Sequence, residues 1–192
     1  NNVNQIIPML GANPDDGLKL GFTNTYTTYG FERNPFTSQH KINAAYYFAT
    51  DGYELGYKGE FANVFGGLNF GFQAHFQSPN YSVNFFGYGN ETENFDDDFG
   101  LDYNRVKTRI FRVSPQLIWN SKRGSLIHFG VSYEVNEIQN TDNRFVSDNN
   151  VLPENIFDEE HFGGINAKYD YSNYDNNAYP TNGMNISIET GY

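Results

Sequence analysis

The chain has 192 residues, of which 18 are Phe, 15 are Tyr and 1 is Trp, and its 12 basic and 23 acidic residues give a formal net charge of −11. This charge argues against nucleic acid as a partner, because binding to phosphates needs an excess of Lys and Arg. The absence of cysteine excludes a disulfide scaffold, a thiolate zinc site and a cysteine nucleophile. No linker-like stretch divides the chain, so we expect one domain, or part of one, over residues 1–192.

Hydrophobic and polar residues alternate along most of the chain. This is the pattern of β-strands, because successive strand side chains point to opposite faces. Residues 68–77 place Leu, Phe, Phe, Ala and Phe on one face and Asn, Gly, Gln, His and Gln on the other. No ten-residue window has helical periodicity. In chain order, the nine predicted strands are residues 5–10, 18–27, 41–48, 53–65, 68–77, 103–119, 127–136, 162–174 and 184–189.

The sixth predicted strand changes phase along its length. Arg105, Lys107 and Arg109 occupy one face at its start, but from Phe111 onward the residues at the same spacing are apolar. A β-bulge near Phe111 would produce this change. The three basic side chains would then share a face with carboxylates of other strands, either as a structural network or as an anion path. The candidate carboxylates are Glu54, Glu60 and Glu134.

The connections between the strands fall into two classes. Residues 78–102 and 136–161 are long, polar and acidic, whereas Thr50-Asp51-Gly52, Gly66-Gly67, residues 122–124 and residues 179–183 form short turns. If the strands are antiparallel neighbours in chain order, both long loops lie at one end of the sheet. Alternating strands of about ten residues, an aromatic apolar face and unequal loops are typical of a transmembrane β-barrel. We therefore predict an all-β, antiparallel transmembrane barrel, and a soluble β-sandwich or barrel is the alternative.

Two motifs resemble the bacterial surface antigen family. Tyr179-Pro180-Thr181-Asn182-Gly183 is similar to a YPT-x-G turn of that family, and Phe85-Phe86-Gly87-Tyr88-Gly89-Asn90-Glu91 is similar to one of its F-x-G-x-G-N-E segments. Residues 13–18 resemble the first hairpin of the family. Arg33-Asn34-Pro35-Phe36 and the aromatic, Asn-rich composition resemble members from Bacteroidetes-type bacteria. Some of these members carry a calcineurin-like phosphoesterase ahead of the barrel.

The family belongs to an outer-membrane superfamily that includes the barrel-assembly protein BamA and the two-partner secretion transporters. The resemblance implies a sixteen-strand barrel, and the chain would be its N-terminal part, with about nine strands. It also implies a bacterial outer-membrane location, contact with lipid, and a role as a membrane anchor. Assembly or translocation of other outer-membrane or surface proteins would follow from the same resemblance. We expect no enzymatic activity and no cofactor.

Two other functions stay open. A soluble all-β binding module could use surface aromatic residues such as Trp119 to bind carbohydrate. The chain could also be the barrel portion of an enzyme whose catalytic domain lies elsewhere.

Few residues suggest chemistry of their own. The four histidines, His40, His75, His128 and His161, lack the spacing of a zinc site, so we expect no metal site. His75 and His128 belong to the polar strand faces. The acidic stretch from Glu91 to Asp102 contains the ligand type that Ca²⁺ prefers, but it fits no EF-hand spacing, and a solvated outer loop is the alternative.

The predicted topology leads to two expectations. Nine is an odd number of strands, and single-chain bacterial barrels close with an even number, so strands one and nine should have unpaired edges. Outer loops of such barrels are longer than periplasmic turns. The long acidic loops should therefore face the cell exterior.

Overall fold

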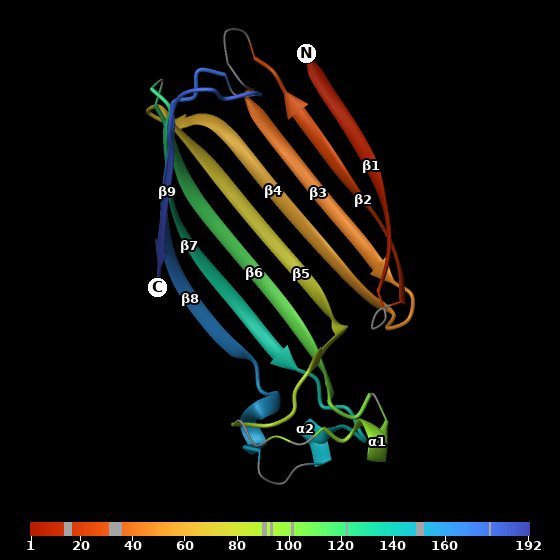
Figure 1. Ribbon diagram of the computed structural model, residues 1–192. Coiled ribbons are helices and arrows are strands. Elements are labelled where there is room, and N and C mark those ends of the chain that lie inside the picture. The colour runs from red at the N-terminus through yellow and green to blue at the C-terminus, as the bar shows by residue number, and fades with distance from the viewer. Residues whose placement is uncertain are drawn as a thin grey trace.

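The computed structural model describes residues 1–13, 17–30, 36–89, 92, 94–100, 102–121, 123–148, 152–176 and 178–192. This part of the chain forms one antiparallel sheet of nine strands, which are neighbours in their order along the sequence (Figure 1). The all-β prediction is therefore confirmed. The strands are β1 (Asn2–Asn13), β2 (Gly17–Thr28), β3 (Ser38–Tyr47), β4 (Gly52–Phe65), β5 (Leu68–Asn84), β6 (Arg105–Asn120), β7 (Ser125–Ile138), β8 (Glu160–Ser172) and β9 (Asn185–Gly191).

Three short helices lie between strands. They are α1 (Asp96–Phe99) between β5 and β6, and α2 (Phe145–Asp148) and the 3-10 helix η1 (Glu154–Phe157) between β7 and β8. Among the described residues, no helix is long and apolar enough to cross a membrane.

Two strands are much longer than the alternation of the sequence predicts. β1 has twelve residues because its backbone pairs with β2 over its whole length. β5 continues to Asn84, so the first long loop begins at Phe85 and not at Ser78. The backbone of a neighbouring strand can extend a ladder where the side chains no longer alternate, because the ladder bonds join backbone groups.

The irregularity of this region lies in β5, so the predicted bulge in β6 is wrong. The register between β5 and β6 shifts between Gln77 and Tyr81, and the intervening residues around Pro79 stand opposite Arg109. Proline has no N–H to donate to a ladder, and bulges are where sheets accommodate it. β6 keeps the same offset to β7 on both sides of Phe111. Arg105, Lys107 and Arg109 therefore share a face with Phe111.

The sheet is strongly curved (Figure 1), and its two faces differ in burial. Side chains on the concave face converge and cover one another, whereas those on the convex face spread apart. Six buried strand residues share the concave face, which carries alternate residues of each strand: Thr27, Ala45, Tyr47, Gln77, Val106 and Ile118.

Both long connections lie at one end of the sheet, as predicted, together with the short turn between β3 and β4. The long connections between β5 and β6 and between β7 and β8, with all three helices, lie at one end (Figure 1), which we call the loop rim. The turn at Gly66-Gly67 and the connections from β6 to β7 and from β8 to β9 lie at the other end, which we call the turn rim.

The sheet is open, and β1 and β9 are its edge strands. β1 pairs with β2 and β9 pairs with β8, and within the described chain no ladder joins β1 to β9. The prediction of two unpaired edges is therefore confirmed. The N–H of Tyr29 donates to the carbonyl of Asn1, and alternation from this pair directs the nitrogen of Pro8 away from β2. Pro8 consequently removes no bond from the ladder and stands on the free edge.

Candidate functional site

The convex face carries continuous rows of apolar side chains. One row follows the printed pairing of six strands, and its members Leu55, Phe22 and Phe111 are 49%, 43% and 41% exposed. No second layer of the described chain covers this face. The row consists of Phe22, Ala44, Leu55, Phe76, Phe111 and Val135. A second row, nearer the turn rim, consists of Phe61, Phe70, Leu117, Phe129 and Ala167.

Aromatic clusters flank these rows near the turn rim. The ring of His40 lies 5.2 Å from that of Phe61, 6.1 Å from that of Tyr57 and 6.4 Å from that of Tyr26. His40 Nδ1 and the Tyr57 hydroxyl are 2.9 Å apart and share a hydrogen bond. This bond satisfies two polar groups within an otherwise apolar surface.

A second set of aromatic pairs lies near the loop rim. The rings of Tyr46 and Phe48 are 5.1 Å apart, and those of Tyr53 and Phe76 are 5.8 Å apart. Further along the sheet, the Tyr133 hydroxyl and His161 Nδ1 are 2.9 Å apart, and their rings stack. The apolar rows of the convex face are thus bordered at both ends by aromatic residues with polar tips, the arrangement called an aromatic girdle in transmembrane barrels.

The polarity of β6 reverses toward the loop rim. Its convex face is apolar from Phe111 to Trp119, a length of nine residues, and becomes basic at Arg109. Arg109 forms ion pairs with Glu137 and, at 2.6 Å, with Glu159. On the concave face of the same basic segment, Val106 is only 5% exposed. The convex face therefore has an apolar band of limited height, and charged side chains mark its end.

Because of this reversal, the ion pairs expected between the basic residues of β6 and the carboxylates of the polar face do not form among the described residues. Arg105, Lys107 and Arg109 lie on the opposite face from Glu54, Glu60 and Glu134. The sequence signal for the true arrangement was the unbroken spacing of two from Arg105 to Trp119. The residue that does pair with Glu134 is Arg112, which lies directly opposite it.

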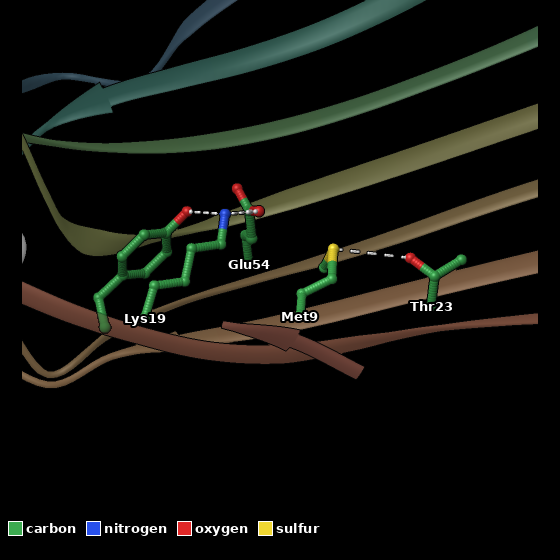
Figure 2. A network of polar contacts seen from close by, with 5 residues as sticks. Met9, Lys19, Thr23 and Glu54 are labelled. Carbon is green, nitrogen blue, oxygen red and sulfur yellow. Dashed lines mark hydrogen bonds and ion pairs between the residues drawn. The ribbon is translucent and has the colours of Figure 1, made fainter. Parts of the chain in front are cut away.

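Hydrogen bonds and ion pairs connect polar side chains on the concave face. Lys19 Nζ donates to the Tyr47 hydroxyl at 2.8 Å and to Glu54 at 3.1 Å, and the Thr23 hydroxyl lies 3.9 Å from the sulfur of Met9 (Figure 2). Further ion pairs and hydrogen bonds lie on β4 to β9, including Lys168–Asp170 at 3.1 Å, Ser187–Asp170 at 2.7 Å and Asn69–Glu60 at 3.0 Å.

The register places His75 and His128 on the concave face, which carries the polar residues, as predicted. His75 lies directly opposite Arg112, and His128 lies directly opposite Lys168. The remaining two histidines, His40 and His161, lie on the convex face in the aromatic clusters described above.

The two long loops pack against each other at the loop rim. Phe145, in the second loop, is the link: its ring lies 5.9 Å from Phe95, 6.0 Å from Phe85 and 6.1 Å from Tyr103, all of the first loop. The N–H of Phe145 donates to the carbonyl of Tyr103 at 2.9 Å. The first loop is therefore tied down by aromatic packing and is not simply a solvated segment.

The resemblance segment at the start of this loop lies partly within the described residues. Phe85 donates its N–H to the carbonyl of Asn104 at 2.8 Å and packs its ring 5.5 Å from Tyr88. Gly87 and Gly89 have φ angles of 105° and 101°, which explains glycine at both positions. Asn90 and Glu91 lie outside the described residues.

The carboxylates of the acidic stretch lie close to this aromatic cluster. Asp102 pairs with Arg105 at 3.0 Å, and Asp97 and Asp98 are exposed. Glu91 and Glu93 lie outside the described residues. Across the part of the chain that the structure describes, no three His, Asp or Glu side chains gather in a way that could hold a metal ion.

The other resemblance motif forms a connection organised by Asp175. Its carboxylate accepts hydrogen bonds from the Thr181 hydroxyl, from the N–H of Thr181 at 3.0 Å and from the N–H of Asn182 at 3.1 Å. These bonds hold the pKa of Asp175 at about 2, below its ordinary 3.8. Gly183 has a φ of 132°, which side-chain-bearing residues avoid. Tyr179 and Pro180 are exposed between these anchors.

No model of a known protein family matches the chain, and no curated protein matches it.

Proposed function

We propose that the chain is part of a bacterial outer-membrane β-barrel and serves as a membrane anchor. The observation that carries this proposal is the convex face, where an uncovered apolar band lies between aromatic clusters and ends in charged residues on β6. In the described chain, 34 large hydrophobic residues are exposed and five hydrophobic residues are buried. A protein surrounded by water rarely exposes so large an apolar surface.

The height of the band supports the same proposal. A transmembrane strand needs about 9–11 residues to cross the hydrocarbon core. The apolar convex segment of β6 has nine residues, from Phe111 to Trp119. Arg105, Lys107 and Arg109 follow on the same face, where the strand would leave the hydrocarbon and enter the polar surface of the bilayer.

Because both edges of the sheet are open, a closed barrel would need further strands. Unpaired backbone groups cannot be satisfied in lipid, so a sheet within a membrane must close on itself. Further strands would pair with β1 and β9, in agreement with the sixteen-strand barrel implied by the surface-antigen resemblance. The concave polar face would then line the lumen. On the same resemblance, we extend the proposal to assembly or translocation of outer-membrane or surface proteins.

A soluble binding module is less well supported. The apolar face of a soluble sheet needs a second sheet or helices packed over it. Trp119, the aromatic residue suggested for carbohydrate binding, belongs to the convex apolar band, where its register partner on β7 is Ile127. Its surroundings favour contact with lipid over contact with a sugar.

A pair of arginine variants on neighbouring positions of β7 tests the anchor. Val131 lies on the convex face and is 43% exposed, whereas Ser132 lies on the concave face opposite Gly164. Arginine on a lipid-facing strand position costs about 2–4 kcal/mol near the bilayer midplane. We expect Val131→Arg to lower the free energy of unfolding from lipid vesicles by that amount and Ser132→Arg to lower it by less than about 1 kcal/mol.

Vesicle flotation provides the direct test. The wild-type chain should float with phospholipid vesicles and should need detergent for extraction. A chain that stays monomeric in buffer without detergent, or equal losses of stability for Val131→Arg and Ser132→Arg, would contradict the proposal.

A further inference from the structure

We propose that the concave face binds a small multivalent oxyanion of the phosphate type, at a site centred on Lys41 and Lys58. These residues lie directly opposite each other on β3 and β4. Opposed side chains of a strand pair have their Cβ atoms about 5 Å apart, and like charges in this position are destabilising. An anion between the two ammonium groups would convert this repulsion into attraction.

Side chains of the neighbouring strands add further hydrogen-bond donors to this site. Gln73 lies opposite Lys58, and Ser114 lies opposite Gln73, so one row carries two amines, an amide and a hydroxyl. In the adjacent row, His75 lies opposite Arg112. All six side chains line one open cavity of about 280 Å³, together with Asn43.

Gly56 lines this cavity and makes room for the side chain of Asn43. It lies between Asn43 and His75 in the register, and a Cβ atom at Gly56 would approach the Asn43 side chain to 2.3 Å. The missing side chain lets the Asn43 amide lie over the backbone of β4. Gly56, which has no side chain, therefore lines the cavity beside donor side chains.

The acidic residues nearest in the register already have partners. Glu54 binds Lys19, Glu60 accepts a hydrogen bond from Asn69, and Glu134 binds Arg112. Among the described residues, no ion pair or hydrogen bond includes Lys41 or Lys58. Two lysines without an ion-pair partner thus line one cavity in a chain whose net charge is −11.

The charge and the donor set favour a phosphate-type anion. Two ammonium groups match an anion with at least two negative charges, and Gln73, Ser114 and Asn43 can donate to its remaining oxygens. The inference does not depend on membrane insertion, because these residues share the concave face in either environment.

Calorimetric titration of the full chain in detergent tests the site, with inorganic pyrophosphate as the probe and sodium chloride at equal ionic strength as the reference. We expect saturable binding to the wild type. The double variant Lys41→Gln/Lys58→Gln should lose at least about tenfold in affinity, because each lysine contributes a charge-assisted hydrogen bond. The same variant should unfold at a higher temperature than the wild type without the anion, since it lacks the repulsion between the two lysines.

The matched control is Lys107→Gln/Lys168→Gln, which removes the same number of positive charges. Lys107 lies on the convex face, and Lys168 is paired with Asp170 on β8. This control should bind pyrophosphate within about twofold of the wild type. Equal loss of affinity in the two double variants would overturn the proposal, because binding would then follow net charge. Absence of saturation in the wild type at about 10 mM pyrophosphate would also overturn it.

Discussion

The carboxylate of Asp175 accepts hydrogen bonds from both the side-chain hydroxyl and the backbone N–H of Thr181, the latter at 3.0 Å. Five residues separate the two, and the N–H of Asp175 also donates to the carbonyl of Asn182 at 3.0 Å. An ionised side chain therefore contributes several of the hydrogen bonds that hold the connection between β8 and β9. The conformation of this connection should depend on the charge of that group.

Acid should loosen this connection between about pH 4 and pH 2. The hydrogen bonds lower the pKa of Asp175 from 3.8 to about 2, so their stabilising effect is complete above the ordinary pKa and is lost as the pH falls through about 2. An NMR titration of the Thr181 amide should have its midpoint near pH 2. The Asp175→Asn variant should lack the transition, and a midpoint near pH 4 in the wild type would contradict this prediction.

Gly183→Ala should destabilise the same connection. The φ of Gly183 is 132°, and an added Cβ would lie 2.7 Å from the carbonyl oxygen of Asn173 and 2.8 Å from Cα of Tyr174. We expect a loss of about 1–3 kcal/mol in the free energy of unfolding, measured with urea. The control is Gly163→Ala, where a Cβ meets no atom within 4 Å. Equal effects of the two substitutions would exclude backbone strain as the reason for Gly183.

Phe145→Ala should separate the two long loops. Its ring contacts Phe85, Phe95 and Tyr103, and each aromatic pair is worth about 0.5–1.5 kcal/mol. Opening of the second loop should increase tryptic cleavage after Arg144 by roughly tenfold or more.

Phe99→Ala is the matched control for Phe145→Ala. The ring contacts of Phe99 with Tyr103, at 4.5 Å, and with Phe95, at 6.2 Å, lie within the first loop. This variant should leave cleavage after Arg144 near the wild-type rate. Similar cleavage rates in the two variants would show that Phe145 does not link the loops.

Single cysteines can test the orientation of the sheet, because the natural sequence contains none. Asn140 lies at the loop rim and Arg123 at the turn rim, and both are exposed. If the long loops face the cell exterior, a maleimide that does not cross membranes should label Asn140→Cys on intact cells but not Arg123→Cys. The reverse labelling would invert the proposed topology.

Much of the sheet could be predicted from side-chain alternation alone. The strand at residues 68–77 alternates without exception, so its two faces follow from a spacing of two, and the preceding turn follows from the Gly66-Gly67 pair. The ends of the strands were harder to predict from the sequence. β1 extends to Asn2 and Asn13 because β2 offers it backbone partners, which leaves no trace in the hydropathy of β1.

The candidate functional surfaces could likewise be predicted only in part. The aromatic convex face was predictable, because the apolar residues recur at every second position. The contacts of Phe145 were not, since they join two loops that are remote in sequence. Pro79 offered a signal for the true bulge, but the change from basic to apolar residues along β6 drew the prediction to Phe111.

The sequence by itself determined that this protein is a sheet of alternating strands with one aromatic face, because side-chain spacing is a local property of the chain. Only the tertiary structure decided that β6 continues without a bulge, so that Arg105, Lys107 and Arg109 share the convex face with Phe111, because the register to β7 is the same on both sides of Phe111. It also brought Lys41 opposite Lys58 and placed both lysines with Arg112 around one cavity. Those juxtapositions depend on the register between four strands, which is set by backbone pairing.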